Sequence, residues 1–274
     1  MHIHMNVALC FCVRNCAEFL KDIFSNIECV KTLNINVYTI FIYDNCTDDS
    51  EHLLEEYKKN NNNVILRNII NESELRTERI AKARNECLNI IYNELGNIKY
   101  HMMIDADNVC VRQWNVDVLN NYLNNFDNDN WDCISFNNDD YYDIWALMFD
   151  NFRHHCWGFS EGGGWDGAVG LLKKYIRFRL DTLQENSMEV LSAFNGICLY
   201  KTENFKGFYY DGLYSNFKKI ITEEELINTV NAFKKYNLNV KLDHSWVECC
   251  EHLFYHVSAF KKGLKIKISK FKIM

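Results

Sequence analysis

Residues 100–109 of the chain have the sequence Tyr-His-Met-Met-Ile-Asp-Ala-Asp-Asn-Val. The apolar run predicts a buried strand over His101–Ile104, because it contains few polar groups. The Asp-Ala-Asp-Asn sequence ends this strand, since Asp and Asn favour turns. Ligands bind beyond the carboxyl ends of strands in open α/β sheets. Asp105 and Asp107 therefore predict a hard-oxygen site suited to Mg²⁺ or Mn²⁺ carrying phosphates, and the alternative is an ordinary polar turn.

The chain before this stretch alternates between strand and helix patterns. It predicts strands over Asn6–Val13, Val37–Tyr43 and Val64–Leu66, and helices over Ala17–Cys29, Glu51–Lys59 and Glu74–Leu95. The near-continuous apolar character of the first strand is typical of a parallel sheet covered on both faces. With the strand before Asp105, the order β-α-β-α-β-α-β predicts the α/β fold class and a layered sheet of the nucleotide-binding type.

One positive charge falls on the apolar face of the third helix. Arg84 lies four residues after Ile80 and four residues before Leu88. A buried guanidinium needs an anionic partner, because an unpaired buried charge is costly. Two interpretations stay open and are compatible: Arg84 forms a salt bridge to an acid, such as one in the Asp105 loop, or it clamps a bound phosphate.

The second half of the chain has a less regular pattern. It predicts a helix over Trp114–Phe126, strands over Trp131–Phe136, Leu191–Tyr200 and Leu238–Leu242, and a helix from the capping box Thr222–Glu225 to near Tyr236. Gly196, inside a predicted strand, marks a place where a side chain would obstruct a neighbour. The loop Phe152–Gly164 contains three consecutive glycines. These predict either mobility or close approach to a ligand.

The composition excludes several classes of protein. With 30 Lys and Arg against 37 Asp and Glu, the net charge is −7, which argues against nucleic-acid binding. No apolar run reaches the ~18–20 residues of a membrane span, and the N-terminal residues lack signal-peptide features. We therefore expect a cytoplasmic location, or the host cytoplasm for a viral gene. The 12 cysteines are expected to be buried free thiols. The absence of proline, together with abundant Asn, Ile, Lys, Tyr and Phe, indicates an AT-rich genome.

Several segments, in this order, resemble landmarks of nucleotide-sugar glycosyltransferases with the GT-A fold, close to family 2. They are the first strand ending at Arg14-Asn15, FIYDNCTDDS at 41–50, RIAKARN at 79–85, the Asp-x-Asp sequence of Ile104–Asp107, YDIWAL at 142–147, FNGICLY at 194–200 and CEH at 250–252. The last three are similar to capsular and viral members. The resemblance covers about residues 6–256, and it departs from the family at Asn45-Cys46, where Asp-Gly is usual.

This resemblance implies a Rossmann-like mixed sheet flanked by helices and an enzyme that binds a UDP- or GDP-sugar. It would transfer a hexosyl or deoxyhexosyl group to a glycan, glycolipid or glycoprotein, with inversion. The residues implied to bind the nucleotide sugar are Arg14, Asp44, Arg79, Arg84, Asn85 and Asp105. The metal, Mn²⁺ or Mg²⁺, would be bound by Asp105 and Asp107. Because Mn²⁺ also accepts an imidazole, His252, or His256 four residues later, can complete the set.

An inverting enzyme also needs a carboxylate near the acceptor hydroxyl as general base. The usual Glu-Asp pair of family 2 is not evident in the sequence. The candidates are Glu251, Asp143 and Asp166, with Glu189 as a fourth, and Glu251 is favoured by its position next to His252. Candidates for stacking on a sugar face are Trp145, Trp157 and Trp165.

Two other functions use some of the same features. A nucleotidyltransferase or nucleotide-sugar pyrophosphorylase would also place acids at strand ends, but it usually has a glycine-rich basic loop early in the chain. The first strand here ends in Arg14-Asn15-Cys16-Ala17 instead. A non-catalytic carbohydrate-binding module is the third possibility, and the presence of both aspartates, Arg84 and His252 argues against it.

We expect one domain over residues 1–274, with a nucleotide-binding lobe (1–112) and an acceptor lobe that includes the C-terminal tail (113–274). The tail, Lys261–Met274, holds six lysines and no acid. Its alternation of apolar and cationic residues predicts a strand. Either this strand is a lysine-protected sheet edge, or its cationic face makes peripheral contact with an anionic membrane or glycan.

Overall fold

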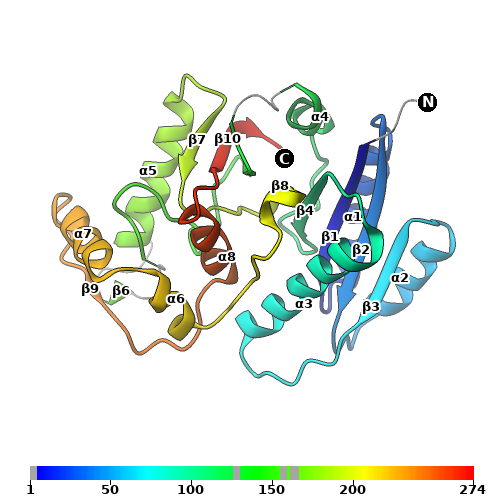
Figure 1. The fold of residues 1–274 in the computed structure, drawn as a ribbon, viewed down its shortest axis with the longest axis horizontal. Coiled ribbons are helices and arrows are strands. Elements are labelled where there is room, and N and C mark those ends of the chain that lie inside the picture. The colour runs from blue at the N-terminus through cyan, green and yellow to red at the C-terminus, as the bar shows by residue number, and fades with distance from the viewer. Residues whose placement is uncertain (1–4, 126–129, 155–158, 161–166) are drawn as a thin grey trace.

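In the computed structural model the chain is built around one mixed sheet (Figure 1). The structure describes residues 5–125, 130–154, 159–160 and 167–274. Eight strands lie in the order β3-β2-β1-β4-β8-β5-β10-β7. Their bounds are β1 Met5–Val13, β2 Ile35–Tyr43, β3 Val64–Asn68, β4 Tyr100–Asp105, β5 Cys133–Asn137, β7 Ser187–Val190, β8 Ile197–Lys201 and β10 Ile266–Lys272. The predicted α/β class and the mixed sheet are confirmed.

Strand direction brings distant parts of the chain to one edge of the sheet. Strands β1, β2, β3 and β4 are mutually parallel, and β8 runs antiparallel to both β4 and β5. The carboxyl ends of β1, β2 and β4 therefore lie at the same edge as the residues that precede β8. The segments that follow Val13, Tyr43 and Ile104 therefore lie close together, beside the turn at Gly196.

Helices cover both faces of the sheet. The bounds are α1 Ala17–Lys31, α2 Ser50–Lys59, α3 Arg76–Ile90, α4 Val116–Asn124, α5 Ala168–Thr182, α6 Tyr214–Ile220, α7 Glu223–Lys234 and α8 Glu251–Phe260. Alternate residues of β1 enter two separate cores, with Val7 and Leu9 packing with α1 and α4 and with Ala8 packing with α3. Both faces of β1 are thus buried, which explains its unbroken apolar sequence.

The third predicted helix, Glu74–Leu95, is shorter and less regular than its pattern indicates. The α-helix α3 covers Arg76–Ile90, and the last predicted turn, Ile91–Leu95, is π-helical. Arg84 is 3% exposed, as expected from its position on the apolar face.

Two predicted strands are wrong in extent. The segment Leu191–Tyr200 becomes a strand only at Ile197, because Asn195 and Gly196 have positive φ angles of 57° and 90° that break the pleat. The segment Leu238–Leu242 supplies only Lys241–Leu242 (β9), which pairs with Phe159–Ser160 (β6) in a separate two-stranded sheet. The residues before β9 instead form the turn that follows α7, in which the Leu238 amide donates a hydrogen bond to the Phe233 carbonyl.

The tail forms an interior strand, so the edge-strand interpretation is wrong. Strand β10 pairs parallel to β5 on one side and antiparallel to β7 on the other. Four of its lysines bond to protein groups: Lys261 to Glu225, Lys265 to Glu189, Lys270 to the Gln184 carbonyl and Lys272 to Asp139. Membrane contact through the tail stays a prediction. In the described residues no helix combines the length and apolar character that crossing a membrane requires.

The predicted capping box at the start of α7 is confirmed and gives a prediction about pH. Burial raises the pKa of Glu225, but bonds from the Thr222 amide, Lys261 and Arg153 outweigh this effect and lower that pKa to about 2. Because the pKa is about 4.3 in an unfolded chain, this stabilisation is complete above that pH and is lost as the pH falls toward 2. We expect Glu225→Gln to lower the urea midpoint at pH 7 and to lose this effect progressively below pH 4.

The matched control is Glu224→Gln. Glu224 lies in the same first turn of α7 but is exposed. It should show little difference from the natural chain at either pH. An equal effect of the two substitutions would contradict the assignment of the stabilisation to the Glu225 network.

Candidate active site

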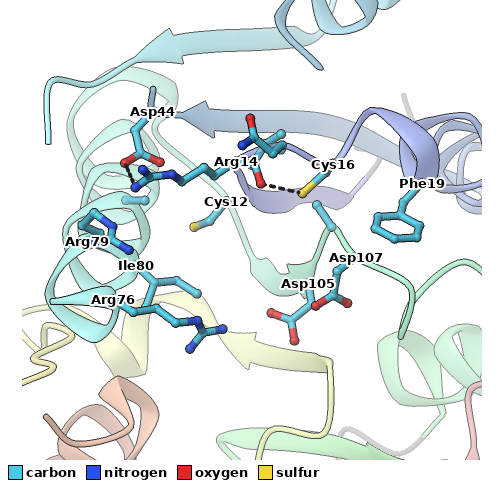
Figure 2. A pocket seen from close by; sticks show the side chains of 14 residues that line it. Cys12, Arg14, Cys16, Phe19, Asp44, Arg76, Arg79, Ile80, Asp105 and Asp107 are labelled. Carbon is cyan, nitrogen blue, oxygen red and sulfur yellow. Dashed lines mark hydrogen bonds and ion pairs between the residues drawn. The ribbon is translucent and has the colours of Figure 1, made fainter. Parts of the chain in front are cut away.

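A pocket of about 310 Å³ lies at the carboxyl edge of the sheet, between the ends of β1, β2 and β4 and the start of α3. Three acids and three arginines line it: Asp44, Asp105, Asp107, Arg14, Arg76 and Arg79. In Figure 2, Asp105 and Asp107 lie at one side of this pocket, and Asp44 with Arg14 lies at the other. We call this space the large pocket. Asp44, implied to bind the nucleotide, and the two aspartates implied to bind the metal therefore line one pocket, and their binding roles stay predictions.

Asparagines shape the two loops at the far side of the large pocket. Asn15 and Asn45 have φ angles of 54° and 44°, a left-handed conformation that Asn tolerates better than most residues. The Asn15 side chain accepts a 2.7 Å hydrogen bond from the Thr47 amide, which ties the two loops together. Asp44 is 3.5 Å from Arg14 and buried.

A second, smaller pocket of about 120 Å³ adjoins the large one. The two share Arg76, Ile80, Asp105 and Asp107 in their linings, so the two carboxylates stand at the junction. The small pocket is otherwise lined by Thr77, Arg84, Tyr142, Asp143, Trp145, Phe194, Cys250, Glu251 and His252. Among these, Trp145 is 37% exposed, and it therefore offers part of its ring to solvent.

Arg84 holds the two sides of the small pocket together. Its guanidinium lies 3.1 Å from Oδ1 of Asp105 on β4 and 3.2 Å from Oε1 of Glu251 on α8. It also stacks over the ring of Phe194 at 4.6 Å. The salt bridge that the sequence left open is confirmed, and the role as a phosphate clamp stays a prediction.

Asp105 is held from two directions. Arg84 contacts Oδ1, and the Tyr142 hydroxyl donates a 3.0 Å hydrogen bond to Oδ2. Burial raises the pKa of Asp105 to about 7, although Arg84 acts in the opposite direction. A carboxyl group with this pKa is partly protonated near neutral pH, so a bound cation would compete with the proton for the same oxygens. A divalent cation would displace the proton.

Two of the predicted base candidates lie in the small pocket. Asp143 is 8% exposed, and burial raises its pKa to about 6, although Oδ1 accepts a hydrogen bond from the Ala146 amide. Glu251 is 3% exposed and is already paired with Arg84. Glu189 is on the edge strand β7 in an exposed pair with Lys265, and it lines neither pocket. Asp166 lies outside the described residues, as do Trp157 and Trp165.

His252 lines the small pocket with both aspartates, and the structure allows a test of whether it suits a metal. Its ring stacks on Phe194 at 3.8 Å, and neither ring nitrogen has a hydrogen-bond partner among the residues that the structure describes. Burial lowers the pKa of His252 well below its usual value, so the imidazole is neutral, as a ligand must be. An orphaned neutral imidazole beside two carboxylates fits Mn²⁺. The three residues are not a preformed set, because their ligand atoms are not all within 4.8 Å of one another.

The remaining predicted residues have mainly structural contacts. Arg79 lines the large pocket while donating to the carbonyls of Ser73 and Glu74. Asn85 bonds to the backbone of Tyr210 and lines neither pocket. His256 lies deeper in the core, against Ser192 and Tyr200. Most of the predicted loop Phe152–Gly164 lies outside the described residues.

Sequence reasoning missed two residues that line the site. Arg76 lines both pockets and makes no ion pair within the described part of the chain. Tyr142 fixes Asp105 from a loop after β5. Arg76 could have been identified from the sequence by its position in the first turn of α3, beside the strand ends. Tyr142 had no signal beyond its membership of the YDIWAL segment.

The absence of a side chain at Gly196 leaves room for the Tyr142 hydroxyl, which agrees with the prediction that a side chain here would obstruct a neighbour. A Cβ atom at Gly196 would lie 3.1 Å from Val109 and 3.2 Å from the Tyr142 hydroxyl, at a φ angle of 90°. We expect Gly196→Ala to cost about 1 kcal/mol of backbone strain and a further 1–3 kcal/mol of overpacking, measured by urea unfolding.

Gly207→Ala is the matched control, because Gly207 has a φ angle of 91° and no atom of the described residues lies within 4 Å of the added Cβ. It should cost only the backbone strain. Equal losses in the two variants would show that the crowding at Gly196 has no energetic weight.

The fold and the site together define an α/β protein with an acidic, cation-compatible cleft at the carboxyl edge of its sheet. Neither a scan against protein-family models nor a search of curated proteins finds a match to the chain. The chain is similar to solved structures that include a UDP complex, a synthase and a mannosyltransferase.

The structure of S. aureus TarS 1-349 in complex with UDP is 13% identical to this chain, and the match covers 89% of this chain and 59% of that one, with a TM-score of 0.44. The glucosyl-3-phosphoglycerate synthase of M. tuberculosis is 11% identical over 74% of this chain and 60% of that one, with a TM-score of 0.43. The mannosyltransferase PcManGT from Pyrobaculum calidifontis, in complex with GDP-Man and Mn²⁺, is 14% identical over 76% of this chain and 48% of that one, with a TM-score of 0.41. The chain thus spans less than two thirds of each, and likeness at this level assigns neither a family nor an activity.

Proposed function

We propose that the chain is a metal-dependent glycosyltransferase of the GT-A type that moves a sugar from a nucleotide diphosphate to a hydroxyl acceptor. One observation carries this proposal: two pockets of different size and chemistry meet at Asp105 and Asp107. A transferase for two substrates needs two adjoining spaces with the charge-stabilising groups between them. A simple binding module needs only one.

The large pocket suits the nucleotide diphosphate. Arg14, Arg76 and Arg79 line it, and an arginine guanidinium matches phosphate oxygens in charge and geometry. Asp44, at the side opposite Asp105, accepts hydrogen bonds of the kind that a nucleoside offers. Arg76 also lines the small pocket, so its guanidinium is in reach of the group that leaves when the sugar is transferred.

Asp105, Asp107 and His252 would hold the metal. When bound, Mn²⁺ or Mg²⁺ supplies Lewis-acid stabilisation of the negative charge that develops on the leaving diphosphate. The chain itself orients the ligands, since Tyr142 and Arg84 fix the two oxygens of Asp105. The same two contacts keep Asp105 from turning away from the junction of the pockets.

The small pocket suits the acceptor and the proton transfer. Asp143 has a pKa raised to about 6 by burial, which is close to the value that an efficient general base needs. Glu251 is less free to act, because Arg84 already holds one of its oxygens. We therefore assign removal of the acceptor proton to Asp143, with inversion at the sugar. Trp145, partly exposed at the same pocket, offers an aromatic face to a sugar ring.

The test combines calorimetry with product analysis. UDP and GDP are titrated into the chain with and without Mn²⁺, and a panel of nucleotide sugars is then followed by NMR for hydrolysis or transfer. We expect nucleotide binding that depends on Mn²⁺ and slow release of sugar from one donor. Nucleotide release from a hexose or deoxyhexose donor would identify the transferred group. Absence of nucleotide binding with Mn²⁺ present would contradict the proposal.

A further inference from the structure

A second group of metal-ligating side chains is buried in the core, and none of its members lines either pocket. Cys133 on β5, Cys198 on β8 and His256 on α8 are each 0% exposed. The Cys133 sulfur is 3.2 Å from the Cys198 sulfur and 3.8 Å from Nε2 of His256. In the described residues this is the one group of three or more such side chains whose ligand atoms all lie within 4.8 Å of one another.

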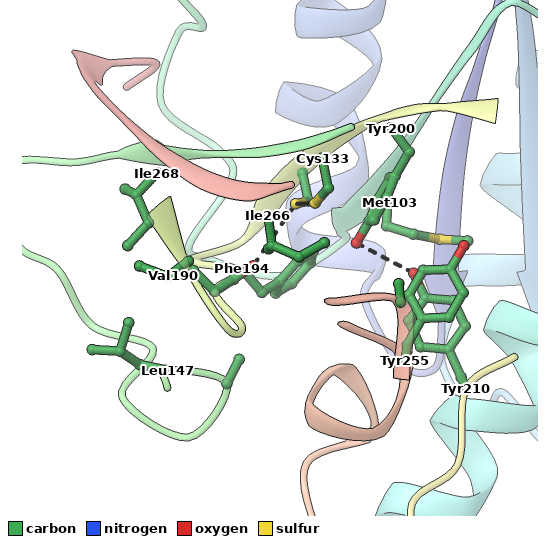
Figure 3. Close-up of a cluster of buried hydrophobic side chains, with 14 of the residues drawn as sticks. Met103, Cys133, Leu147, Val190, Phe194, Tyr200, Tyr210, Tyr255, Ile266 and Ile268 are labelled. Atoms are coloured by element: carbon green, nitrogen blue, oxygen red, sulfur yellow. Dashed lines mark hydrogen bonds between the residues drawn. The ribbon is translucent and has the colours of Figure 1, made fainter. Parts of the chain in front are cut away.

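Strand pairing and helix packing produce this convergence. In the antiparallel pair of β5 and β8, Cys133 lies opposite Tyr200 and Ser135 lies opposite Cys198, so the two cysteines are diagonal neighbours. Both side chains belong to the core on the α8 side of the sheet. His256 reaches them from the second turn of α8. Figure 3 shows Cys133 and Tyr200 in this core, with Tyr210 and Tyr255 beside Tyr200.

The histidine is prepared as a ligand by its neighbours. Its Nδ1 lies 3.1 Å from the Ser192 hydroxyl, and its Nε2 faces Cys133 and the Tyr200 hydroxyl, which is 2.8 Å away. When Nδ1–H donates to Ser192, Nε2 carries the lone pair, which accepts from the Tyr200 hydroxyl and has the Cys133 sulfur 3.8 Å away. A hydrogen bond from the other ring nitrogen is the arrangement that metal-bound histidines use. Burial lowers the pKa of His256 to about 3, so the ring is neutral at physiological pH.

We propose that Cys133, Cys198 and His256 bind a structural zinc ion, with the Tyr200 hydroxyl as the nearest fourth donor. Two thiolates and a neutral imidazole around Zn²⁺ have a net charge of zero. The ion therefore adds no uncompensated charge to an apolar core. The sulfur and nitrogen donors suit zinc and disfavour Mg²⁺, Ca²⁺ and Mn²⁺.

The geometry needs a modest adjustment. Tetrahedral coordination with Zn–S distances of about 2.3 Å separates two thiolate sulfurs by about 3.8 Å, so the cysteines would move apart by roughly 0.6 Å. The Tyr200 hydroxyl would exchange its bond to Nε2 for the ion. The fully buried position gives the ion no access to a substrate, which is why we assign it a structural and not a catalytic role.

Such an ion would fix α8 to the middle of the sheet. Helix α8 begins at Glu251, the partner of Arg84, and continues through His252 to His256. A cross-link at His256 would therefore set the position of the residues one turn earlier in the small pocket. Zinc binding at this core site does not require that the chain transfer sugars, so the two proposals can fail separately.

The test begins with the natural chain, expressed in zinc-supplemented medium and purified without chelator. We expect elemental analysis to find one zinc per chain, and Co²⁺ exchanged into the protein to give thiolate-to-cobalt charge-transfer absorption. Less than half of the chains containing zinc, together with no such absorption, would overturn the proposal. A mass two daltons below that of the fully reduced chain, with a peptide linking Cys133 to Cys198, would also overturn it in favour of a disulfide.

Variants locate the ion. Cys198→Ser should lose the zinc, and a chelator that lowers the unfolding temperature of the natural chain should have no effect on it. Cys87→Ser is the matched control, because Cys87 is equally buried beside other cysteines but has no histidine in its group. It should keep the zinc. Retention of zinc by Cys198→Ser, or equal loss of zinc from both variants, would contradict the proposed site. If the variants do not fold, the cobalt spectrum of the natural chain tests whether thiolates bind the metal.

Discussion

Replacing Asp107 with asparagine is expected to reduce sugar transfer by on the order of a thousandfold, because the metal would lose one of its two charged ligands. Asp107 stands at the junction of the two pockets, and its Oδ1 accepts a hydrogen bond from the Val109 amide, which an asparagine side chain can also accept. The loss should therefore be in activity and in Mn²⁺-dependent nucleotide binding, with the fold preserved. Asp105→Asn should be nearly as severe.

Asp49→Asn is the control for this experiment. Asp49 follows β2 at the same edge of the sheet, is exposed and lines neither pocket. Transfer rates are measured for all three variants across a series of Mn²⁺ concentrations, and circular dichroism checks the fold. Turnover of Asp107→Asn that still rises with Mn²⁺ as in the natural chain would remove the metal site from these residues.

Replacing Arg84 with methionine is expected to destabilise the chain by about 3–5 kcal/mol. The substitution keeps much of the side-chain volume but leaves Asp105 and Glu251 as buried carboxylates without their shared cation. Burial raises the pKa of Asp105 to about 7 and Arg84 opposes this effect, so without the guanidinium Asp105 would favour its protonated form. The loss measured by urea unfolding should therefore shrink as the pH falls and less carboxylate charge is left unpaired.

Two further variants make this result specific. Arg67→Met removes a guanidinium that pairs with Glu86 and Glu94 in a partly exposed position, and it should cost about 1 kcal/mol or less. Adding Glu251→Gln to Arg84→Met removes one of the stranded charges and should restore part of the stability. If the double variant is as unstable as the sum of the single variants, the two residues do not act as a pair.

The first half of the fold follows closely from the sequence, and the second half does not. Strands β1, β2 and β4 are buried on both faces, so their apolar runs identify them with errors of one or two residues. After residue 113 parallel and antiparallel pairings are mixed, and β8 lies between β4 and β5. The position of β10 between β5 and β7 is set by pairing over a long sequence separation, which no local pattern encodes.

The candidate active site shows the same contrast between features that follow from the sequence and features that do not. Asp44, Asp105 and Asp107 follow predicted strands, so the common carboxyl edge of parallel strands places them in one cleft. The partners that define their chemistry come from distant segments: Tyr142 from the loop after β5 and Glu251 from the start of α8. His256 was considered for the same metal as His252, but four residues along a helix place it against different neighbours.

The interior position of β10 has a consequence during synthesis. Both of its neighbours, β5 and β7, leave the ribosome first, and about 80 residues separate β7 from the end of β10, roughly 4–16 s at 5–20 residues per second. Throughout this interval the nascent chain presents two unpaired strand edges, a hazard for association between chains. The lysines interspersed through β10 keep that late strand from pairing with other chains before it enters its place.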